Sequence, residues 1–257
     1  MINLNDILGY KNMKIFQDSD LFSFSLDSII LANYSNIRFR DVKIVDFCTG
    51  NAVVPLILSK RYDKNIDAIE IQTNVFELAK KSVEYNKLCN KIKLYNNDVK
   101  YFCSLEENQN KYDFVLCNPP YFKNNSKSLK NIKSEKMIAR HEIYITLNEI
   151  CSCAKKILKD NGIFCMVHRT DRLMEIFKCL KDNNLEPKSI KFIYNDINSS
   201  SNIVLIHSQK RGKAGLKVDS PLILYETDGS MSLEYKNLIN EVRKWVRRVM
   251  IIVLVYI

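Results

Sequence analysis

An alternation of short apolar runs with longer amphipathic segments begins near residue 43 and continues to residue 209. The apolar runs have the length and composition of buried strands, and the segments between them have helical spacing. The expected strands are 43–47, 66–71, 92–95, 112–117, 162–168, 190–194 and 203–209. The expected helices are 27–35, 52–61, 75–88, 147–159 and 172–182.

Strands that alternate with helices form a mostly parallel sheet, and the last two expected strands have no helix between them. One of those two must therefore run antiparallel at or near an edge. The prediction is an α/β fold with a mostly parallel seven-stranded sheet, helices on both faces and one antiparallel strand near the edge. Around the main domain at 41–210 we expect an extension at 1–40, packing near the functional site, and a tail of uncertain structure at 211–257.

Charge and cysteine usage narrow the class of protein. The net charge of +10 over 257 residues favours a polyanionic partner, with nucleic acid first, although a lysine-rich solvated surface is the alternative. No two of the eight cysteines have the two-residue gap of a zinc knuckle, and there are only three histidines. We therefore expect a reduced, cytoplasmic protein, a monomer or homodimer, without a metal. The apolar run 249–257 is too short for a membrane span, which needs about 20 residues.

Polar residues close four successive expected strands. Asp46 is followed by a turn, Cys48-Thr49-Gly50-Asn51, in which the glycine lets the backbone approach a ligand closely. Glu70 lies at the end of the second strand, Asp98 follows the third, and Asn118 ends the fourth. Each acidic residue alone is typical of a helix cap or turn. Their joint spacing at the ligand-binding edge of the sheet indicates a nucleoside-type cofactor.

The tetrapeptide Asn118-Pro119-Pro120-Tyr121 directly follows the fourth strand. Two prolines stop the strand and fix a rigid, extended turn. The turn holds an amide, which donates and accepts hydrogen bonds, beside an aromatic stacking face. This pair suits a planar group with an exocyclic amine, such as adenine or a glutamine amide.

In these motifs the sequence resembles the class I methyltransferases that use S-adenosylmethionine. It is most similar to their small-domain group, which includes enzymes that methylate adenine N6 in bacterial tRNA. The resemblance covers about residues 22–209, and beyond the tetrapeptide it rests on segments 22–27, 46–52, 68–72, 97–98 and 139–142. Position 52 is Ala where many relatives carry a further glycine, a mild change if it lies in the first helical turn.

The resemblance implies a Rossmann-like methyltransferase domain, S-adenosylmethionine as cofactor and an RNA substrate, with tRNA first. It implies cofactor binding by Asp46, Cys48, Thr49, Gly50, Asn51, Glu70, Ile71, Asp98, Val99 and Asn118. Asn118, Pro119, Pro120 and Tyr121 would be catalytic, since the amide and the Pro119 carbonyl accept hydrogen bonds from the target amine.

Substrate contacts are expected from Tyr121 by stacking, and from Phe22, Lys127, Arg140, His141 and Arg169. Lys127 belongs to a polar segment, 123–136, that reads equally as a substrate-gripping loop or as a surface insert.

Three other functions compete with N6-adenine methylation. A protein glutamine N5-methyltransferase shares the tetrapeptide, but usually carries a helical N-terminal domain that about 40 residues do not accommodate. A guanine-N2 methyltransferase of rRNA tends to have a duplicated domain and Phe at the last motif position, where this chain has Tyr121. A non-catalytic RNA-binding relative would have no need of Asn118 and Glu70.

Overall fold

The computed structural model describes residues 1–18, 26–35, 37, 42–62, 65–121, 142 and 144–239. The strands of its main sheet are β3 (Ile44–Phe47), β4 (Ile66–Glu70), β5 (Ile92–Asn96), β6 (Tyr112–Cys117), β7 (Leu158–Arg169), β8 (Leu185–Tyr194), β9 (Ile203–Lys210), β10 (Lys217–Val218) and β11 (Leu222–Ile223). The helices are α1 (Leu26–Tyr34), α2 (Val53–Ser59), α3 (Thr73–Tyr85), α4 (Val99–Phe102), α6 (Leu147–Ile157), α7 (Leu173–Asp182) and α8 (Leu233–Ile239), with 3₁₀ turns η1 (Glu106–Asn108) and η3 (Thr170–Arg172).

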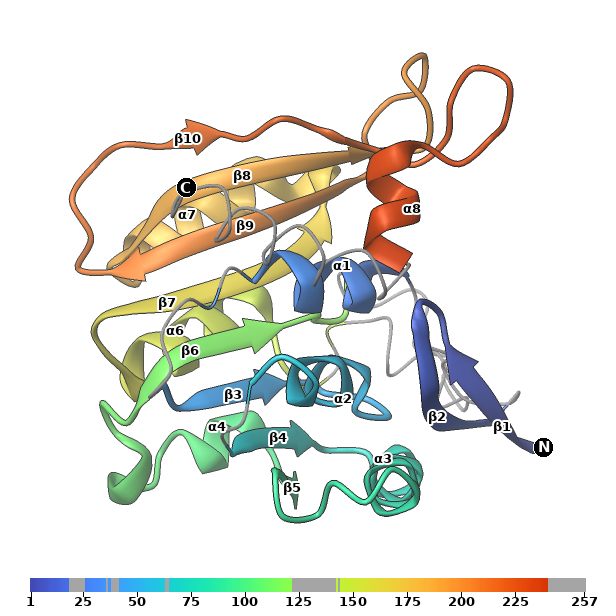
Figure 1. Cartoon of the computed structure of the whole chain (residues 1–257). Coiled ribbons are helices and arrows are strands. Elements are labelled where there is room, and N and C mark those ends of the chain that lie inside the picture. Colours follow the sequence, from blue (N-terminus) through green and yellow to red (C-terminus); the bar gives the residue numbers. More distant parts are fainter. Residues whose placement is uncertain are drawn as a thin grey trace, which may run out of the picture.

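The sheet confirms the predicted architecture (Figure 1). Its order is β10-β8-β9-β7-β6-β3-β4-β5, and β11 also pairs with β8. The strands from β7 through β5 are parallel, whereas β9 runs antiparallel to both β7 and β8. All seven predicted strands are present. The two added strands, β10 and β11, come from the tail and cover the outer edge of β8, which leaves less of that edge exposed to other chains.

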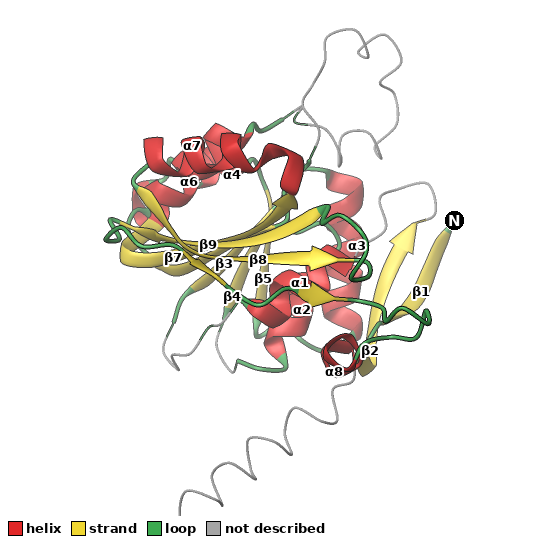
Figure 2. Ribbon diagram, turned by 90° about the horizontal axis from the view of Figure 1, so that it is seen from above, coloured by secondary structure: helices red, strands yellow, loops and turns green. Residues whose placement is uncertain are grey.

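Helices cover both faces of the sheet, as predicted (Figure 2). One core lies under α1, α2 and α3 and contains Ile30, Leu56 and Val83. The other lies under α4, α6 and α7 and contains Phe102 and Leu180. The sheet lies between these two apolar layers. The register between β3 and β6 positions the turns that follow these strands. Phe47 pairs with Cys117, so the turns that follow β3 and β6 leave the same edge side by side.

A separate hairpin of β1 (Ile2–Ile7) and β2 (Tyr10–Asp18) was not predicted (Figure 1). Its β2 strand docks on α3, where the N–H of Phe16 donates to Oγ of Ser82 at 3.0 Å. The amide of Asn51 also donates to the carbonyl of Phe16 at 3.3 Å. The hairpin therefore contacts the turn that follows β3.

Ala52 does not lie in the first turn of a helix, contrary to the sequence interpretation. α2 begins at Val53, and Ala52 precedes it in the left-handed region, with φ of 69° and its methyl fully buried. A glycine would adopt this conformation without the contact between Cβ and the backbone that disfavours it for other residues.

Replacing Ala52 by Gly should leave the free energy of unfolding unchanged or raise it by up to about 1 kcal/mol. The left-handed conformation costs an L-residue about 1–2 kcal/mol, and losing one buried methyl offsets about 0.8 kcal/mol of the relief. The control is Ala79→Gly in the middle of α3, which should lose about 1 kcal/mol or more. Urea unfolding measures the free energy of unfolding of both variants. An equal decrease in the two would show that Ala52 is unstrained.

Candidate active site

A pocket opens at the carboxyl ends of β3, β4, β5 and β6. Its empty space, counted to the open mouth, is about 960 Å³. All ten residues predicted for cofactor binding line it: Asp46, Cys48, Thr49, Gly50, Asn51, Glu70, Ile71, Asp98, Val99 and Asn118. The sheet thus brings together residues that are up to 72 positions apart in the chain, at the edge where such folds bind ligands.

The turn after β3 has an unusual backbone. Cys48, Gly50 and Ala52 all have positive φ, at 54°, 60° and 69°. A Cβ at Gly50 would meet no atom within 4 Å, so the glycine backbone faces open space in the pocket. A ligand can therefore approach this turn closely.

Glu70 holds this turn against the end of β4. One carboxylate oxygen accepts from the N–H of Gly50 and the other from the N–H of Gln72, both at 2.9 Å. Burial raises the pKa of Glu70, and these backbone hydrogen bonds act in the opposite direction. Glu70 is therefore oriented by main-chain donors on both sides before any ligand binds.

Asp46 lies at the floor of the pocket and is 1% exposed. Oγ1 of Thr49 donates to its Oδ2 at 2.6 Å, whereas Oδ1 has no hydrogen-bond partner among the described residues. Burial, opposed by the Thr49 hydrogen bond and aided by the charge of Glu70, raises the pKa of Asp46 to about 8. No Lys or Arg of the described residues pairs with this carboxyl group, and a cationic ligand would supply the missing positive charge.

Asp98 begins α4 as a helix cap, since its side chain accepts from the N–H of Lys100 at 2.7 Å. It also lines the pocket. The capping role and the predicted ligand role are therefore compatible, because a carboxylate has further acceptor sites. The ammonium of Lys100 reaches the carbonyl of Tyr144 at 2.9 Å and so ties α4 to the opposite wall.

The chemistry of this pocket fits S-adenosylmethionine. Three carboxyl groups make the wall rich in acceptors, and so does the buried Oε1 of Gln72, which has no hydrogen-bond partner in the described part of the chain. The cofactor offers matching donors in its ammonium, ribose hydroxyls and adenine amine, as well as the positive sulfonium. Ile71 and Val99 add an apolar surface beside Asp98.

The tetrapeptide lies at the end of β6, and α1 holds it by two side chains. Nδ2 of Asn118 donates to Oγ of Ser28 at 2.9 Å, which directs Oδ1 the other way. The hydroxyl of Tyr121 lies 2.5 Å from Oδ1 of Asn118 and 2.9 Å from Oδ2 of Asp27, and it can donate its hydrogen bond to either oxygen. Asn118 and Pro120 line the pocket, whereas Pro119 and Tyr121 are not among the described lining residues.

One face of Tyr121 packs on His168, with ring centroids 5.1 Å apart and planes inclined by 49°. His168 is fully buried at the end of β7, and its Nδ1 accepts from the N–H of Arg169 at 2.7 Å. Burial first, and then the charge of Arg172, lower the pKa of His168 to about 4. The ring is therefore a neutral support for Tyr121 near neutral pH.

Of the predicted substrate contacts, the structure describes Tyr121 and Arg169. Phe22, Lys127, Arg140 and His141 lie outside the described residues, as do the segment 123–136 and the apolar run 249–257. Arg169 is the last residue of β7, and its guanidinium donates to Oδ2 of Asp171 at 3.0 and 3.1 Å. It is not among the described residues that line the pocket.

Sequence reasoning missed several residues of the site. Ser28, Gln72 and Tyr144 line the pocket, and Asp27 and Arg172 contact Tyr121. Asp27 ends one of the segments that resemble the methyltransferases, so that segment was the available signal. Nothing in the order of residues connects Arg172 with the tetrapeptide.

Among the described residues, no group of three or more His, Cys, Asp or Glu side chains is arranged to hold a metal ion. The helices of the described ranges include none that is long and apolar enough to cross a membrane.

Asp46→Asn should stabilise the ligand-free protein increasingly as pH rises from about 4 to about 8. The folded pKa of Asp46, about 8, exceeds its ordinary 3.8, so its favourable contribution is complete below 3.8 and is lost as pH rises through 8. An uncharged amide avoids this loss, and each pKa unit is worth about 1.4 kcal/mol. The measurement is the melting temperature of the variant minus that of the wild type, at pH 5 and at pH 8.5. The same difference at both pH values would contradict the prediction.

The same variant should bind S-adenosylmethionine more weakly, because it removes a negative charge that we expect to face the cationic cofactor. Titration calorimetry at pH 8.5 tests this. Unchanged affinity would show that Asp46 does not serve the cofactor.

Two comparisons of sequence bear on this site. The model of a family described as RNA methyltransferase matches residues 20–171, more than half of the chain. The tRNA1(Val) (adenine(37)-N6)-methyltransferase of Trichodesmium erythraeum is 26% identical over 166 residues, covering 63% of this chain and 67% of that protein. The protein of the same name from Christiangramia forsetii is 24% identical and covers 76% and 80%.

The fold has solved counterparts. A predicted O-methyltransferase from Agrobacterium tumefaciens has a TM-score of 0.66 at 18% identity, covering 82% of this chain and 94% of that one. At this identity the likeness concerns the fold alone. Together with the family match, it confirms the prediction of a Rossmann-like, S-adenosylmethionine-dependent methyltransferase. The chain belongs to the RNA methyltransferase family.

Proposed function

We propose that this protein transfers a methyl group from S-adenosylmethionine to the N6 amine of an adenine in tRNA. The observation that carries the proposal is the position of Asn118, which lines the pocket from a turn held by Ser28 and Tyr121. The RNA methyltransferase family match supports an RNA substrate. The names of the two relatives, which specify adenine N6 in a tRNA, support the finer choice.

Asp46, Gly50, Glu70 and Asp98 would hold the cofactor, with Ile71 and Val99 beside its adenine. When bound, S-adenosylmethionine supplies an electrophilic methyl group. Asn118 and the Pro119 carbonyl would accept hydrogen bonds from the target amine and so orient its lone pair. The N–CH3 bond would form as the S–CH3 bond breaks, S-adenosylhomocysteine would leave, and the methylated amine would then release one proton to water. Because a neutral amine can attack without losing a proton first, catalysis would come mainly from proximity and orientation.

Tyr121 has two tasks in this proposal. Its hydroxyl lies at Oδ1 of Asn118, so an incoming amine would replace it there and leave Asp27 as its acceptor. The ring face not packed on His168 would stack on the target base. A base in folded RNA must leave its stack to reach this position.

Affinity for tRNA would come mostly from charge, given the net charge of +10. We propose Phe22, Lys127, Arg140, His141 and Arg169 as substrate contacts, and we expect a monomer or homodimer acting in the cytoplasm.

The test is methyl transfer from radiolabelled S-adenosylmethionine to three pools: total tRNA, total rRNA and total protein. Nucleosides from labelled RNA are then separated. We expect label in tRNA as N6-methyladenosine. Label in protein would replace the proposal with glutamine methylation, label in rRNA guanine with the guanine-N2 alternative, and no label would leave a non-catalytic RNA-binding protein.

A further inference from the structure

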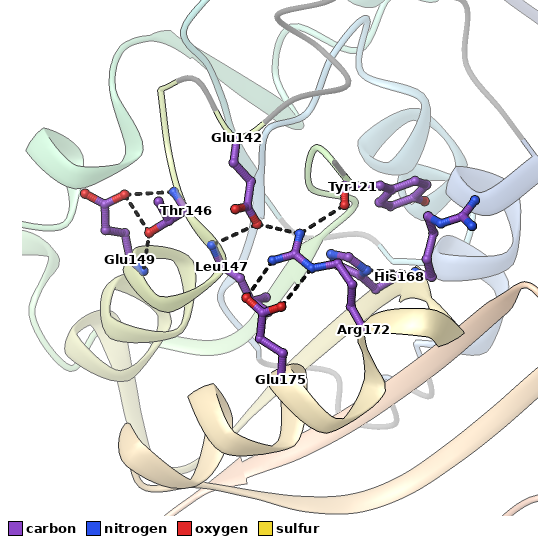
Figure 3. Close-up of polar contacts among 9 residues, drawn as sticks. Tyr121, Glu142, Thr146, Leu147, Glu149, His168, Arg172 and Glu175 are labelled. Carbon is purple, nitrogen blue, oxygen red and sulfur yellow. Dashed lines mark hydrogen bonds and ion pairs between the residues drawn. The ribbon is translucent and has the colours of Figure 1, made fainter. Parts of the chain in front are cut away.

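Arg172 joins three segments of the site (Figure 3). It lies at the end of η3, and its side chain is only 10% exposed. Its Nη1 donates to the carbonyl of Tyr121 at 3.0 Å and to Oε1 of Glu142 at 2.7 Å. Its Nε and Nη2 form a two-pronged contact with Glu175 at 3.2 and 2.8 Å. The guanidinium is thus fixed by partners along two of its edges.

The contact with Tyr121 concerns the main chain at the last position of the tetrapeptide. The carbonyl, not the ring, receives the hydrogen bond, so Arg172 acts on the position of the turn itself. α1 holds the side chains of Asn118 and Tyr121 from the other side. The turn is therefore held from two directions.

The contact with Glu142 reaches the wall of the cofactor pocket. Oε1 of Glu142 also accepts from the N–H of Leu147, the first residue of α6, at 3.3 Å (Figure 3). Tyr144 and Ile145, which lie between these two residues, line the pocket. The side chain of Glu142 is 7% exposed, so this link is shielded from water.

We propose that Arg172 is a positioning residue for methyl transfer, holding the turn that receives the target amine at a fixed place relative to the cofactor pocket. The contacts of Arg172 are with the Tyr121 carbonyl, Glu142 and Glu175, so Arg172 would act through these residues. Its planar fork is suited to this task, since it contacts a carbonyl and two carboxylates at once, which the point charge of a lysine does not reproduce. The assay rests on the proposed function, because it needs a methyl acceptor.

If Arg172 served stability alone, a variant that keeps the stability of the wild type would also keep its kcat. A double variant provides this test. Replacing both members of a buried ion pair by apolar residues is often neutral or stabilising, whereas removing one leaves a buried charge. Arg172→Met/Glu142→Leu should therefore fold with a melting temperature near that of the wild type. Glu175 is then left partly exposed in the first turn of α7, a favourable place for a carboxylate.

The experiment measures kcat, KM for tRNA, Kd for S-adenosylmethionine and melting temperature in this double variant and in Arg172→Lys. We expect kcat to fall by about 10- to 100-fold in both, because small displacements of reacting groups cost that much. In Arg172→Lys, where Glu142 still accepts from Leu147, Kd for the cofactor should change by less than about threefold, since Asp46, Gly50 and Glu70 do not depend on Arg172. A folded double variant with wild-type kcat would overturn the proposal.

Lys210→Met is the matched control. Lys210 is also buried, and its ammonium donates to the carbonyl of Leu158 at 2.6 Å, at the opposite end of β7 from the site. Its kcat should stay at the wild-type value. An equal fall in kcat in Lys210→Met would assign the effect to general stability and overturn the positioning role. Failure of the proposed function is distinct, because the wild-type protein would then leave tRNA unlabelled.

Discussion

Substituting Asn118 by Ala should lower kcat for methyl transfer by about 10²- to 10³-fold, the loss seen when one preorganised polar group is removed from an active site. The alanine removes the acceptor for the target amine. The Kd for S-adenosylmethionine should change only a few-fold, because Glu70 and Asp98 keep their own hydrogen bonds. Single-turnover kinetics and calorimetry separate the two quantities.

Ser28→Ala gives a graded comparison. It leaves Oδ1 of Asn118 in place but removes the acceptor that orients the amide at 2.9 Å. We expect a smaller fall in kcat, about tenfold, because the amide then has freedom to rotate. The control is Asn183→Ala at the end of α7, away from the pocket, which should cost stability without changing kcat. Full activity in Asn118→Ala would refute the proposed mechanism.

Glu70→Gln should raise the Kd for S-adenosylmethionine by about 100-fold. Both oxygens of Glu70 accept from backbone N–H groups, of Gly50 and of Gln72. A glutamine must turn its NH₂ toward one of these donors, which loses a hydrogen bond to a charged group, worth about 1.5–3 kcal/mol, and leaves two donors facing each other. The turn after β3 would then shift away from the ligand.

Calorimetry checks this prediction by measuring the Kd for S-adenosylmethionine and for its demethylated product, S-adenosylhomocysteine. At saturating cofactor we expect kcat to recover to within about tenfold of the wild type, because the tetrapeptide is untouched. Glu186→Gln is the control, since Glu186 pairs with Lys181 away from the pocket. If Glu70→Gln binds the cofactor as the wild type does, Glu70 is not the residue that organises the site.

The predicted sheet came from periodicity alone, because burial on both faces makes each parallel strand a continuous apolar run. Val45 and Phe47 in β3, and Val115 and Cys117 in β6, are fully or almost fully buried. The hairpin of β1 and β2 escaped prediction because half of β1 is Asn or Asp and all of its residues but Ile7 are exposed. Its partner surface, on α3, is more than 60 residues further along the chain.

The residues that line the cofactor pocket could also be predicted from the sequence, because they follow from the parallel strands. Parallel strands end at one edge, so the polar residues that close them converge whatever the details of packing. All ten predicted residues line the pocket, although their roles in binding remain predictions. Ala52 shows the limit of such reasoning. Its left-handed φ of 69° depends on how the chain leaves the turn, which composition does not specify.

The sequence by itself determined the order of elements, the edge at which a ligand binds and the identity of the tetrapeptide, because these depend on local spacing. Only the tertiary structure decided what holds that tetrapeptide. Ser28 and Arg172 lie 90 and 54 positions from Asn118, on elements that share no periodic relation with β6. Their contacts arise from the packing of α1 and of η3 against one edge of the sheet. Side-chain geometry of this kind exists only once the layers are assembled.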